Sequence, residues 1–319
     1  MTAAVVVPNR NGRRWLPRCL DAIEAQTRPA AEIVVVDNGS TDDSLAYLAD
    51  RHPRVRVIAL GRNTGFAGAA NRGIEAVDAR AVALVNTDVE LAPDWLARTT
   101  AVLDSDAEAG AVACKMVSLE DPEVLYDAGD VLRRDGVCEQ RGRFRRDDGR
   151  YDAAGEVFAA CAGAALYRRA ALEEVRGFDE RFFLYLEDVD LGLRLRLAGW
   201  RCRYEPVVAR HAGGGSAGEL ERPAAAWVER NTLLLAAKAF PARWAPLVLY
   251  RQLAWAWHAA RERRLREHLR GAAAALPVMP AMLRERRSLR AGARVSIADA
   301  IPARPVRGPR AGGHPRARE

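Results

Sequence analysis

The 319-residue sequence lacks several features that would define its class at once. It has no run of about 18 uncharged apolar residues, so a transmembrane helix is not expected. Its five cysteines form no CxxC pair, so neither a zinc knuckle nor a disulfide framework is indicated. The start of the chain has no basic segment before its apolar run, so no signal peptide is expected. These absences favour a protein of the reducing cytoplasm.

The composition is that of a folded protein, with 49% hydrophobic and 29% charged residues. The net charge of +7 is unevenly spread, because residues 241–319 carry 17 basic and 5 acidic residues whereas residues 1–240 carry 32 and 37. A basic C-terminal part predicts attraction to nucleic acid or to an anionic membrane. A genome that prefers Arg and Ala would produce the same excess, and only Lys115 and Lys238 are lysines.

The first 90 residues alternate apolar runs with segments of helical periodicity. The apolar runs predict strands at residues 3–7, 32–36, 55–60 and 81–85. Apolar residues at helical spacing predict helices between them, and Ser40 with Asp43 resembles a capping box for the helix 42–49. This alternation indicates a parallel sheet covered on both faces, whose ligands bind at the carboxyl ends of the strands.

The second half of the chain has a less regular pattern. Arg141–Asp152 is polar and predicts an exposed loop or hairpin, and Val189–Ala198 predicts a helix that stops at Gly199. A strand at Arg201–Ala209 leads to His211. Beyond residue 240 the pattern is helical and basic, and the segment from Ile301 onward is rich in Pro, Arg and Gly, which is typical of disorder.

Polar residues follow three of the predicted strands. Asp37 can accept a hydrogen bond from a nucleobase or a ribose, although Asp-Asn-Gly is also good turn chemistry. The glycine-containing loop 62–68 opens a helix, so its N–H groups can face a phosphate or simply form a tight turn. Asp88 ends a buried strand, where a charge is costly unless it meets a cation such as a metal on a diphosphate. Capping of the next helix is the alternative for Asp88.

Glu187, Asp188 and Asp190 follow an apolar run. Acids in a first helical turn stabilise the helix dipole, but three of them indicate a carboxylate at the edge of a pocket. His211 can be a metal ligand, although a lone histidine is more often structural. The residues 213–218 match G-x-G-x-x-G, but no strand–helix context or following acid supports a dinucleotide site, so a flexible loop is expected there.

The order of these motifs resembles that of the family 2 glycosyltransferases with the GT-A fold, above all the bacterial rhamnosyltransferase-like members. The motifs are VVVPNRNG, EIVVVDNGSTD, NTGFAGAANRGI, ALVNTDVEL and GFDERFFLYLEDVDLGLRLRLAGW, followed by His211. The resemblance implies a GT-A catalytic domain at 1–240, with a Rossmann-like, mostly parallel sheet between helices. Its donor half would span about 1–115 and its acceptor half 116–240. A basic amphipathic helical region at 241–300 and a disordered tail at 301–319 would follow.

The resemblance also implies roles for individual residues. The nucleotide-sugar site would be lined by Pro8, Asn9, Asp37, Asn63, Gly65, Asn71 and Thr87. A divalent metal, Mg²⁺ or Mn²⁺, would bind Asp88 and His211, and Asn86 stands where many members have the first Asp of a DxD motif. Asp188 would be the catalytic base, with Glu187 and Asp190 supporting it on the acceptor side.

The implied reaction is an inverting transfer from a nucleoside-diphosphate sugar, of the dTDP-rhamnose or UDP-hexose type. The acceptor would be a hydroxyl of a cell-surface glycan or a polyprenyl-linked glycan. Asp188 would take the proton as the hydroxyl becomes acidic during attack, so an ordinary carboxylate pKa would suffice.

Two other classes compete with this interpretation. A nucleotidyltransferase would open with a Gly-rich, Arg-containing loop after the first strand, which VVVPNRNG does not resemble. A non-catalytic sugar-nucleotide or polyanion-binding protein would share the basic C-terminal part. Nucleic acid is not expected as a partner, because no aromatic residue interleaves with the basic ones after Arg284.

The segment 241–290 combines aromatic and basic residues. Trp244, Tyr250, Trp255 and Trp257 lie among arginines, a pattern typical of a helix at the membrane interface. We therefore expect a peripheral protein on the inner face of the cytoplasmic membrane, unless this helical face packs on the catalytic domain.

Overall fold

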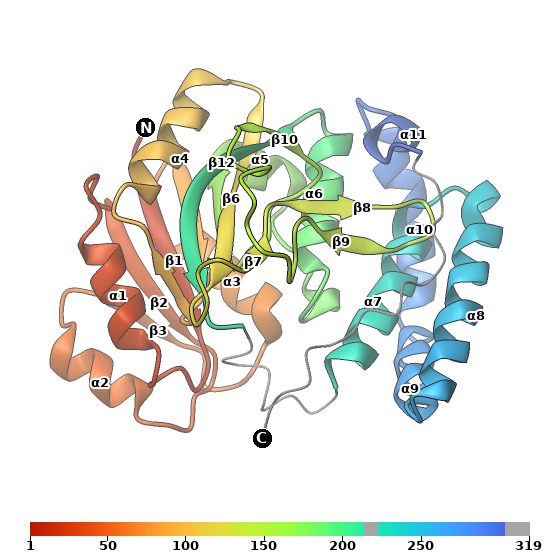
Figure 1. Cartoon of the computed structure of the whole chain (residues 1–319), viewed down its shortest axis with the longest axis horizontal. Helices are drawn as coiled ribbons and strands as arrows, with labels where there is room; N and C mark the ends of the chain where they lie inside the picture. The colour runs from red at the N-terminus through yellow and green to blue at the C-terminus, as the bar shows by residue number, and fades with distance from the viewer. Residues whose placement is uncertain (214–222, 304–319) are drawn as a thin grey trace.

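The computed structural model describes residues 1–213 and 223–303. A mixed ten-stranded sheet lies between helices, and a layer of C-terminal helices covers one side of this unit (Figure 1). The predicted α/β architecture with a C-terminal helical appendage is therefore confirmed.

The first half of the sheet is parallel and contains the predicted strands. They lie in the order β3 (Arg56–Ala59), β2 (Glu32–Asp37), β1 (Ala3–Asn9) and β4 (Ala81–Val85). Alternate residues of β1 belong to different hydrophobic cores, Val6 to one and Val5 to the other. Both faces of the strand are thus buried, which explains the unbroken apolar run.

Helices cover the two faces of this half. On one face lie α1 (Leu16–Glu24), α2 (Ser44–Arg51) and α4 (Trp95–Ser105), and on the other lies α3 (Gly65–Ala76). The predicted capping box is wrong. Asp43 is the N-cap residue of α2 without a side-chain cap, and the Ser40 hydroxyl instead accepts from the Asn9 side chain and the Asn11 N–H.

The second half of the sheet is largely antiparallel. It comprises β5 (Val89–Leu91), β6 (Ala109–Ser118), β7 (Leu125–Asp127), β10 (Gly155–Val157), β11 (Ala164–Arg168) and β12 (Arg201–His211). The strand β11 runs antiparallel between β4 and β6, while β12 is parallel to β6. A separate hairpin is formed by β8 (Asp130–Leu132) and β9 (Cys138–Gln140), and the predicted loop at 141–152 follows it.

Three helical elements follow β11. They are α5 (Arg169–Val175), the 3-10 helix η1 (Glu180–Phe182) and α6 (Glu187–Leu197). The predicted helix and its end are confirmed, because Gly199 lies just past the Ala198 C-cap with φ of +90°.

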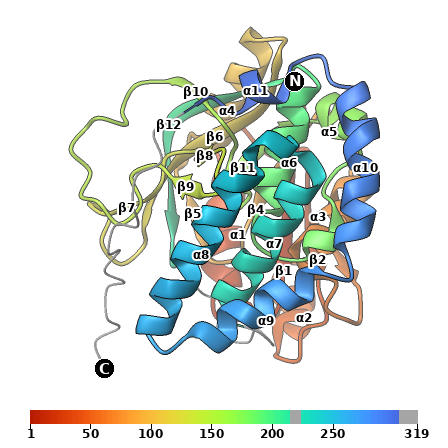
Figure 2. The ribbon, with the colours of Figure 1, turned by 90° about the vertical axis from the view of Figure 1, so that its right-hand side faces the viewer.

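The C-terminal layer faces the viewer in Figure 2. It contains α7 (Ala224–Ala239), η3 (Ala242–Trp244), α8 (Ala245–Arg261), α9 (Leu265–Ala275), α10 (Met279–Ala291) and α11 (Ile297–Ala300). No helix within 1–213 and 223–303 is long and apolar enough to cross a bilayer. Ile301 is buried and its carbonyl accepts from Arg134, whereas residues 304–319 of the predicted tail lie outside the described residues.

A buried ionic network joins this layer to the sheet domain. The Lys238 ammonium of α7 lies 2.7 Å from the Asp179 carboxylate and 2.8 Å from the Asp190 carboxylate of α6. Arg194 pairs with Asp190, while Arg181 pairs with both Asp179 and Glu285 of α10. Burial alone would raise the pKa of Asp179, but Arg181 and Lys238 hold it well below its usual range. The network therefore fixes α7 and α10 against η1 and α6.

Candidate active site

The ends of β1 and β2 bring two predicted donor-site residues together. Asn9 and Asp37 are register partners and almost fully buried, and the Asn9 amide donates to the Asp37 carboxylate at 3.0 Å. Asn9 Oδ1 has no hydrogen-bond partner among the described residues. A Cβ on Gly12 would lie 2.3 Å from that oxygen and 3.0 Å from the Thr87 hydroxyl. Asn9, Thr87 and the backbone of Gly12 thus lie close together, while Pro8 lies one residue earlier on β1.

Asn38, which follows β2, joins the end of that strand to the predicted phosphate loop at 62–68. Asn38 donates to Asn63 Oδ1 at 3.1 Å and to the Gly65 carbonyl at 3.0 Å, and accepts from the Thr64 N–H. Asn63 also accepts from the Gly65 N–H. The side chain of Asn63 therefore shapes the loop while remaining exposed at its surface.

Gly65 and Asn71 connect the donor half to the acceptor half. Gly65 has φ of +77°, and a Cβ there would lie 2.4 Å from the Phe183 carbonyl, so only glycine fits. The Asn71 amide bonds to the backbone N–H and carbonyl of Phe178 and to Glu180. Both polar atoms of the Asn71 amide are therefore engaged by the segment around η1, and we do not propose a nucleotide contact for it.

Asp88 and His211 lie together where β4 ends and β12 ends. His211 Nε2 is 3.4 Å from Asp88 Oδ1, and each side chain is about 6% exposed. Two ligands about 2.1 Å from one metal ion have such a separation. Burial lowers the pKa of His211 against the opposing effect of Asp88, so the neutral imidazole is favoured.

The Tyr126 ring packs against the His211 ring at a tilt of 34°, with centroids 4.2 Å apart. The Arg143 guanidinium lies over the Tyr126 ring, 5.0 Å from its centroid. Gly213 donates its N–H to His211 Nδ1 at 2.8 Å. Neither Tyr126 nor Arg143 was singled out from the sequence, because short strands and polar loops carry no periodic signal there.

The predicted base, Asp188, lies in the first turn of α6. Its carboxylate accepts from the N–H of Ala162 at 3.1 Å and from that of Val189 at 2.8 Å. The neighbouring Gly163 carbonyl accepts from the Asn86 N–H at 2.9 Å. The dipeptide 162–163 thus connects the base to the Asn86-Thr87-Asp88 motif, and both lie at the same end of the sheet.

Half-buried Asp188 lies near three buried carboxyls, of which Asp127 and Asp130 were not singled out from the sequence. Asp127, Asp130 and Glu187 are each at most 5% exposed, and no ion pair within 4 Å joins them to a cation in the described part of the chain. Burial, with the Asp188 charge second, raises the pKa of Asp127 to about 7. Burial also raises the pKa of Asp188 above its ordinary value.

Asp190 and Glu187 have different surroundings although they share one helical turn. Asp190 is bound by Lys238 and Arg194 in the ionic network, so it stabilises the packing of α6. Glu187 is buried and its Oε2 has no hydrogen-bond partner among the described residues.

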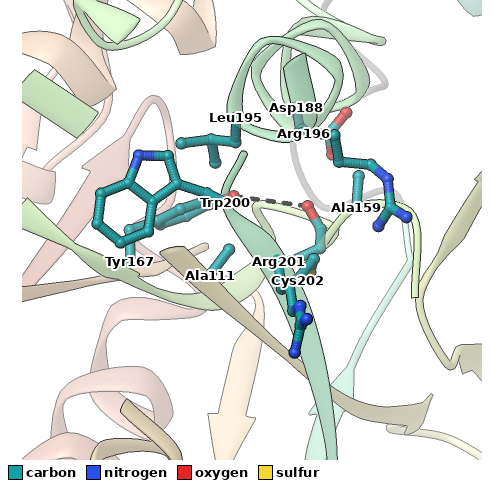
Figure 3. A pocket seen from close by; sticks show the side chains of 11 residues that line it. Ala111, Ala159, Tyr167, Asp188, Leu195, Arg196, Trp200, Arg201 and Cys202 are labelled. Carbon is teal, nitrogen blue, oxygen red and sulfur yellow. Dashed lines mark hydrogen bonds between the residues drawn. The ribbon is translucent and has the colours of Figure 1, made fainter. Parts of the chain in front are cut away.

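The space behind Asp188 is too small for a ligand. A cavity of about 10 Å³ lies between α6, β6 and β12, with the Tyr167 hydroxyl directed at the Ala160 carbonyl (Figure 3). That volume holds about one water molecule. Asp188 can therefore meet an acceptor only from the opposite side.

The proposed role of the Asp188 carboxyl group predicts how kcat depends on pH. Asp188 must lose its proton to act as a base. Its charge raises the pKa of Asp127, and because the repulsion between two carboxylates is mutual, an ionised Asp127 opposes the ionisation of Asp188. We expect Asp127→Asn to move the acid limb of the kcat pH profile to lower pH while turnover at pH 8 stays similar. An acid limb at the same pH in Asp127→Asn would exclude an effect of Asp127 on the ionisation of Asp188. The exposed Glu123→Gln, which removes a charge outside this group, serves as the control.

Comparison with known proteins agrees with this geometry. The model of glycosyl transferase family 2 matches residues 4–176. The chain belongs to glycosyl transferase family 2. A relative within the family, the N-acetylglucosaminyl-diphospho-decaprenol L-rhamnosyltransferase of Mycobacterium tuberculosis, is 32% identical over 216 residues, 60% of this chain and 69% of the relative. The predicted rhamnosyltransferase-like glycosyltransferase is confirmed at this level.

Solved structures confirm the GT-A-like fold of this family 2 glycosyltransferase. Staphylococcus aureus TarS 1-349 in complex with UDP-GlcNAc matches with a TM-score of 0.57 at 17% identity, covering 91% of each chain. The mannosyltransferase PcManGT of Pyrobaculum calidifontis, in complex with GDP-Man and Mn²⁺, matches with a TM-score of 0.53 at 22% identity, covering 90% of this chain and 79% of the other.

Proposed function

We propose that this glycosyltransferase moves a sugar, with inversion, from a nucleoside diphosphate to a hydroxyl of a polyprenyl-linked or growing surface glycan. The observation that carries the proposal is the bridge 162–163, which holds Asp188 and the Asp88 motif at one end of the sheet. A base and a leaving-group site must lie this close for a single displacement. The rhamnosyltransferase relative favours a dTDP-rhamnose type of donor and a lipid-linked acceptor, with a UDP-hexose as the alternative donor.

The donor site is proposed at the ends of β1, β2 and β4. Asn9 and Asp37, with Pro8 beside them, contact the base and ribose, and Asn63 and Gly65 line the same site. The buried, unpartnered Asn9 oxygen supports this placement. In this proposal Thr87 lies between the nucleoside and the diphosphate of the donor.

Asp88 and His211 would hold Mg²⁺ or Mn²⁺, which offsets charge on the departing diphosphate when bound. Two protein ligands leave room for diphosphate oxygens, and the described residues contain no larger cluster of His, Cys, Asp and Glu that could hold an ion. Asp188 receives the proton of the acceptor hydroxyl as the oxygen attacks the anomeric carbon. Its raised pKa makes it a stronger base than an exposed Asp.

A thermal-shift screen tests the donor site. Nucleoside diphosphates with Mg²⁺ or Mn²⁺ should raise the Tm, because ligands of the folded state stabilise it by mass action. EDTA should remove most of this shift, and Asp88→Ala should weaken diphosphate binding far more than nucleoside binding. A Tm shift that is equal with and without metal would contradict the metal site. The exposed Asp43→Ala serves as the control.

We also propose that α8 docks on an anionic membrane at the cytoplasmic face. Trp244 and Val248 pack inward in the structure, unlike the docking residues Leu249, Tyr250, Leu253 and Trp257, which are each more than 50% exposed. These four side chains recur at helical spacing on α8, and Leu269 of α9 and Leu276, its C-cap residue, are also exposed. Arg261, Arg263 and Arg266 are exposed beside them, and arginines near an anionic surface contribute about 1 kcal/mol each.

Liposome flotation tests this docking. The whole chain should float with vesicles that contain anionic lipid, and added salt should weaken the binding. Leu253→Ser with Trp257→Ser should abolish flotation without lowering the Tm, because both side chains are exposed. Leu45→Ser, which changes an exposed leucine on α2, should float normally. Equal flotation of the two variants would exclude α8 as the docking face.

A further inference from the structure

The five residues before α6 form a strained segment, Phe182–Leu186. Phe183 has φ of +63° and ψ of −62°, and the Leu184 N–H donates to the Phe182 carbonyl at 2.7 Å. This is the rarer γ-turn, which non-glycine residues seldom adopt. Tyr185 and Leu186 also have positive φ, of +67° and +62°. Three such residues in a row of four persist only when the surroundings hold them.

One side chain on α7 holds this segment. Asn231 is fully buried, and its amide nitrogen lies 2.9 Å from the carbonyl of Phe182, 2.9 Å from that of Leu184 and 2.7 Å from that of Tyr185. Three carbonyls thus share the two N–H groups of one amide. The Asn231 oxygen accepts from Arg230, which also donates to the Arg181 carbonyl.

The opposite side of the segment is fixed by packing. The Phe183 ring stacks on Trp227 of α7 with centroids 5.0 Å apart, and the Phe183 carbonyl accepts from the Ala67 N–H of α3. The segment is therefore held between α3 at the donor loop and α7. Leu186, its last residue, is the N-cap of α6 and lacks a side-chain cap bond. The direction in which α6 starts thus depends on the backbone angles of Tyr185 and Leu186.

We propose that Asn231 is a positioning residue for Asp188. It acts through the strained segment, because relaxation of Tyr185 and Leu186 toward negative φ would rotate the first turn of α6, which carries the base two residues later. The proposal rests on the base role of Asp188. It differs from that role in placing part of the control of catalysis on α7, whose Asn231 is bonded to the segment and not to Asp188.

The test compares Asn231→Ala with Thr232→Ala. Thr232 is an equally buried neighbour whose methyl faces Gly136, away from the segment. Asn231→Ala should lower kcat by about 10–100-fold, as expected for a misplaced catalytic group, while the dissociation constant for nucleoside diphosphate stays within about two-fold. Thr232→Ala should keep kcat, with all assays run well below each Tm. A kcat that falls equally in both variants, or in neither, would overturn the proposal.

Hydrogen exchange provides a readout that does not depend on turnover. Backbone amides of residues 183–188 should exchange faster in Asn231→Ala and not in Thr232→Ala. Unchanged exchange would show that Asn231 does not hold the segment, whatever reaction the enzyme catalyses. Faster exchange with an unchanged kcat would show that Asn231 holds the segment but does not position Asp188 for catalysis. Failure of Asp188→Asn to affect turnover would instead contradict the proposed function.

A second variant tests the strain itself. Glycine adopts φ of +62° without the Cβ clash, so Leu186→Gly should restore part of the lost kcat in the Asn231→Ala background. The double variant should then be more active than Asn231→Ala alone. A double variant that is less active would contradict the strain argument.

Discussion

Asp188→Asn is expected to lower kcat by about 10²–10⁴-fold, the usual contribution of a positioned general base, with donor binding nearly unchanged. The amide keeps the shape of the carboxylate but cannot take the acceptor proton. The measurement is steady-state turnover together with the dissociation constant for the nucleoside diphosphate. Near-native turnover would remove Asp188 from the mechanism.

The stability of the same variant gives a second outcome with a definite sign. Burial raises the pKa of Asp188 in the folded state, so the carboxyl favours folding while protonated and loses this contribution as the pH rises through that pKa. The amide stays neutral, so Asp188→Asn should equal or exceed the wild-type Tm at pH 8. Asp190→Asn should behave in the opposite way, with a lower Tm, because it weakens the pairing of Lys238 and Arg194.

Lys238→Met is expected to lower the free energy of unfolding by about 3–5 kcal/mol, because it leaves buried carboxylates with fewer cations. The Lys238 side chain is about 1% exposed, and Asp179 and Asp190 are both buried beside it. The folded-state pKa of Asp179 is lowered, so its stabilisation is present at neutral pH and is lost as the pH falls through the folded pKa. Denaturant unfolding at pH 7 and at about pH 2 measures both effects.

The only other lysine of the sequence is a matched control. Lys115 pairs with Asp147 and Asp152 in the 141–154 loop, and the Asp152 side chain is 63% exposed. Its carboxylate partners can turn to water, so Lys115→Met should cost about 1 kcal/mol or less. Equal losses for the two lysines would contradict a special role of the Lys238 network.

The sequence predicted the elements whose signal is local. The strand Ala81–Val85 has the predicted bounds, and the polar ends of β1, β2 and β4 meet as the parallel topology requires. The base motif was also recognisable, since three acids in a first helical turn exceed what helix capping needs. The domain boundary near residue 240 remains a prediction, although α7 packs with α9 and α10.

What the sequence did not predict depends on partners that are distant along the chain. Asp190 looked like its neighbour Asp188, but Lys238, 48 residues later, gives it a structural role. Asp127 lies on a three-residue strand, too short to show a period, and reaches Asp188 only through the pairing of β7 with β6. The positive φ angles before α6 belong to Phe, Tyr and Leu, residues for which sequence rules predict the opposite.

The stereochemistry of the product tests the central claim most directly. The enzyme would be incubated with dTDP-rhamnose or UDP-hexoses, Mg²⁺ or Mn²⁺ and a polyprenyl-linked acceptor, and the anomeric configuration of the new bond would be determined by NMR. The account predicts acceptor-dependent release of the nucleoside diphosphate and an inverted anomeric centre, both lost in Asp188→Asn. A product with retained configuration, or transfer that persists in Asp188→Asn, would contradict a single displacement driven by this base.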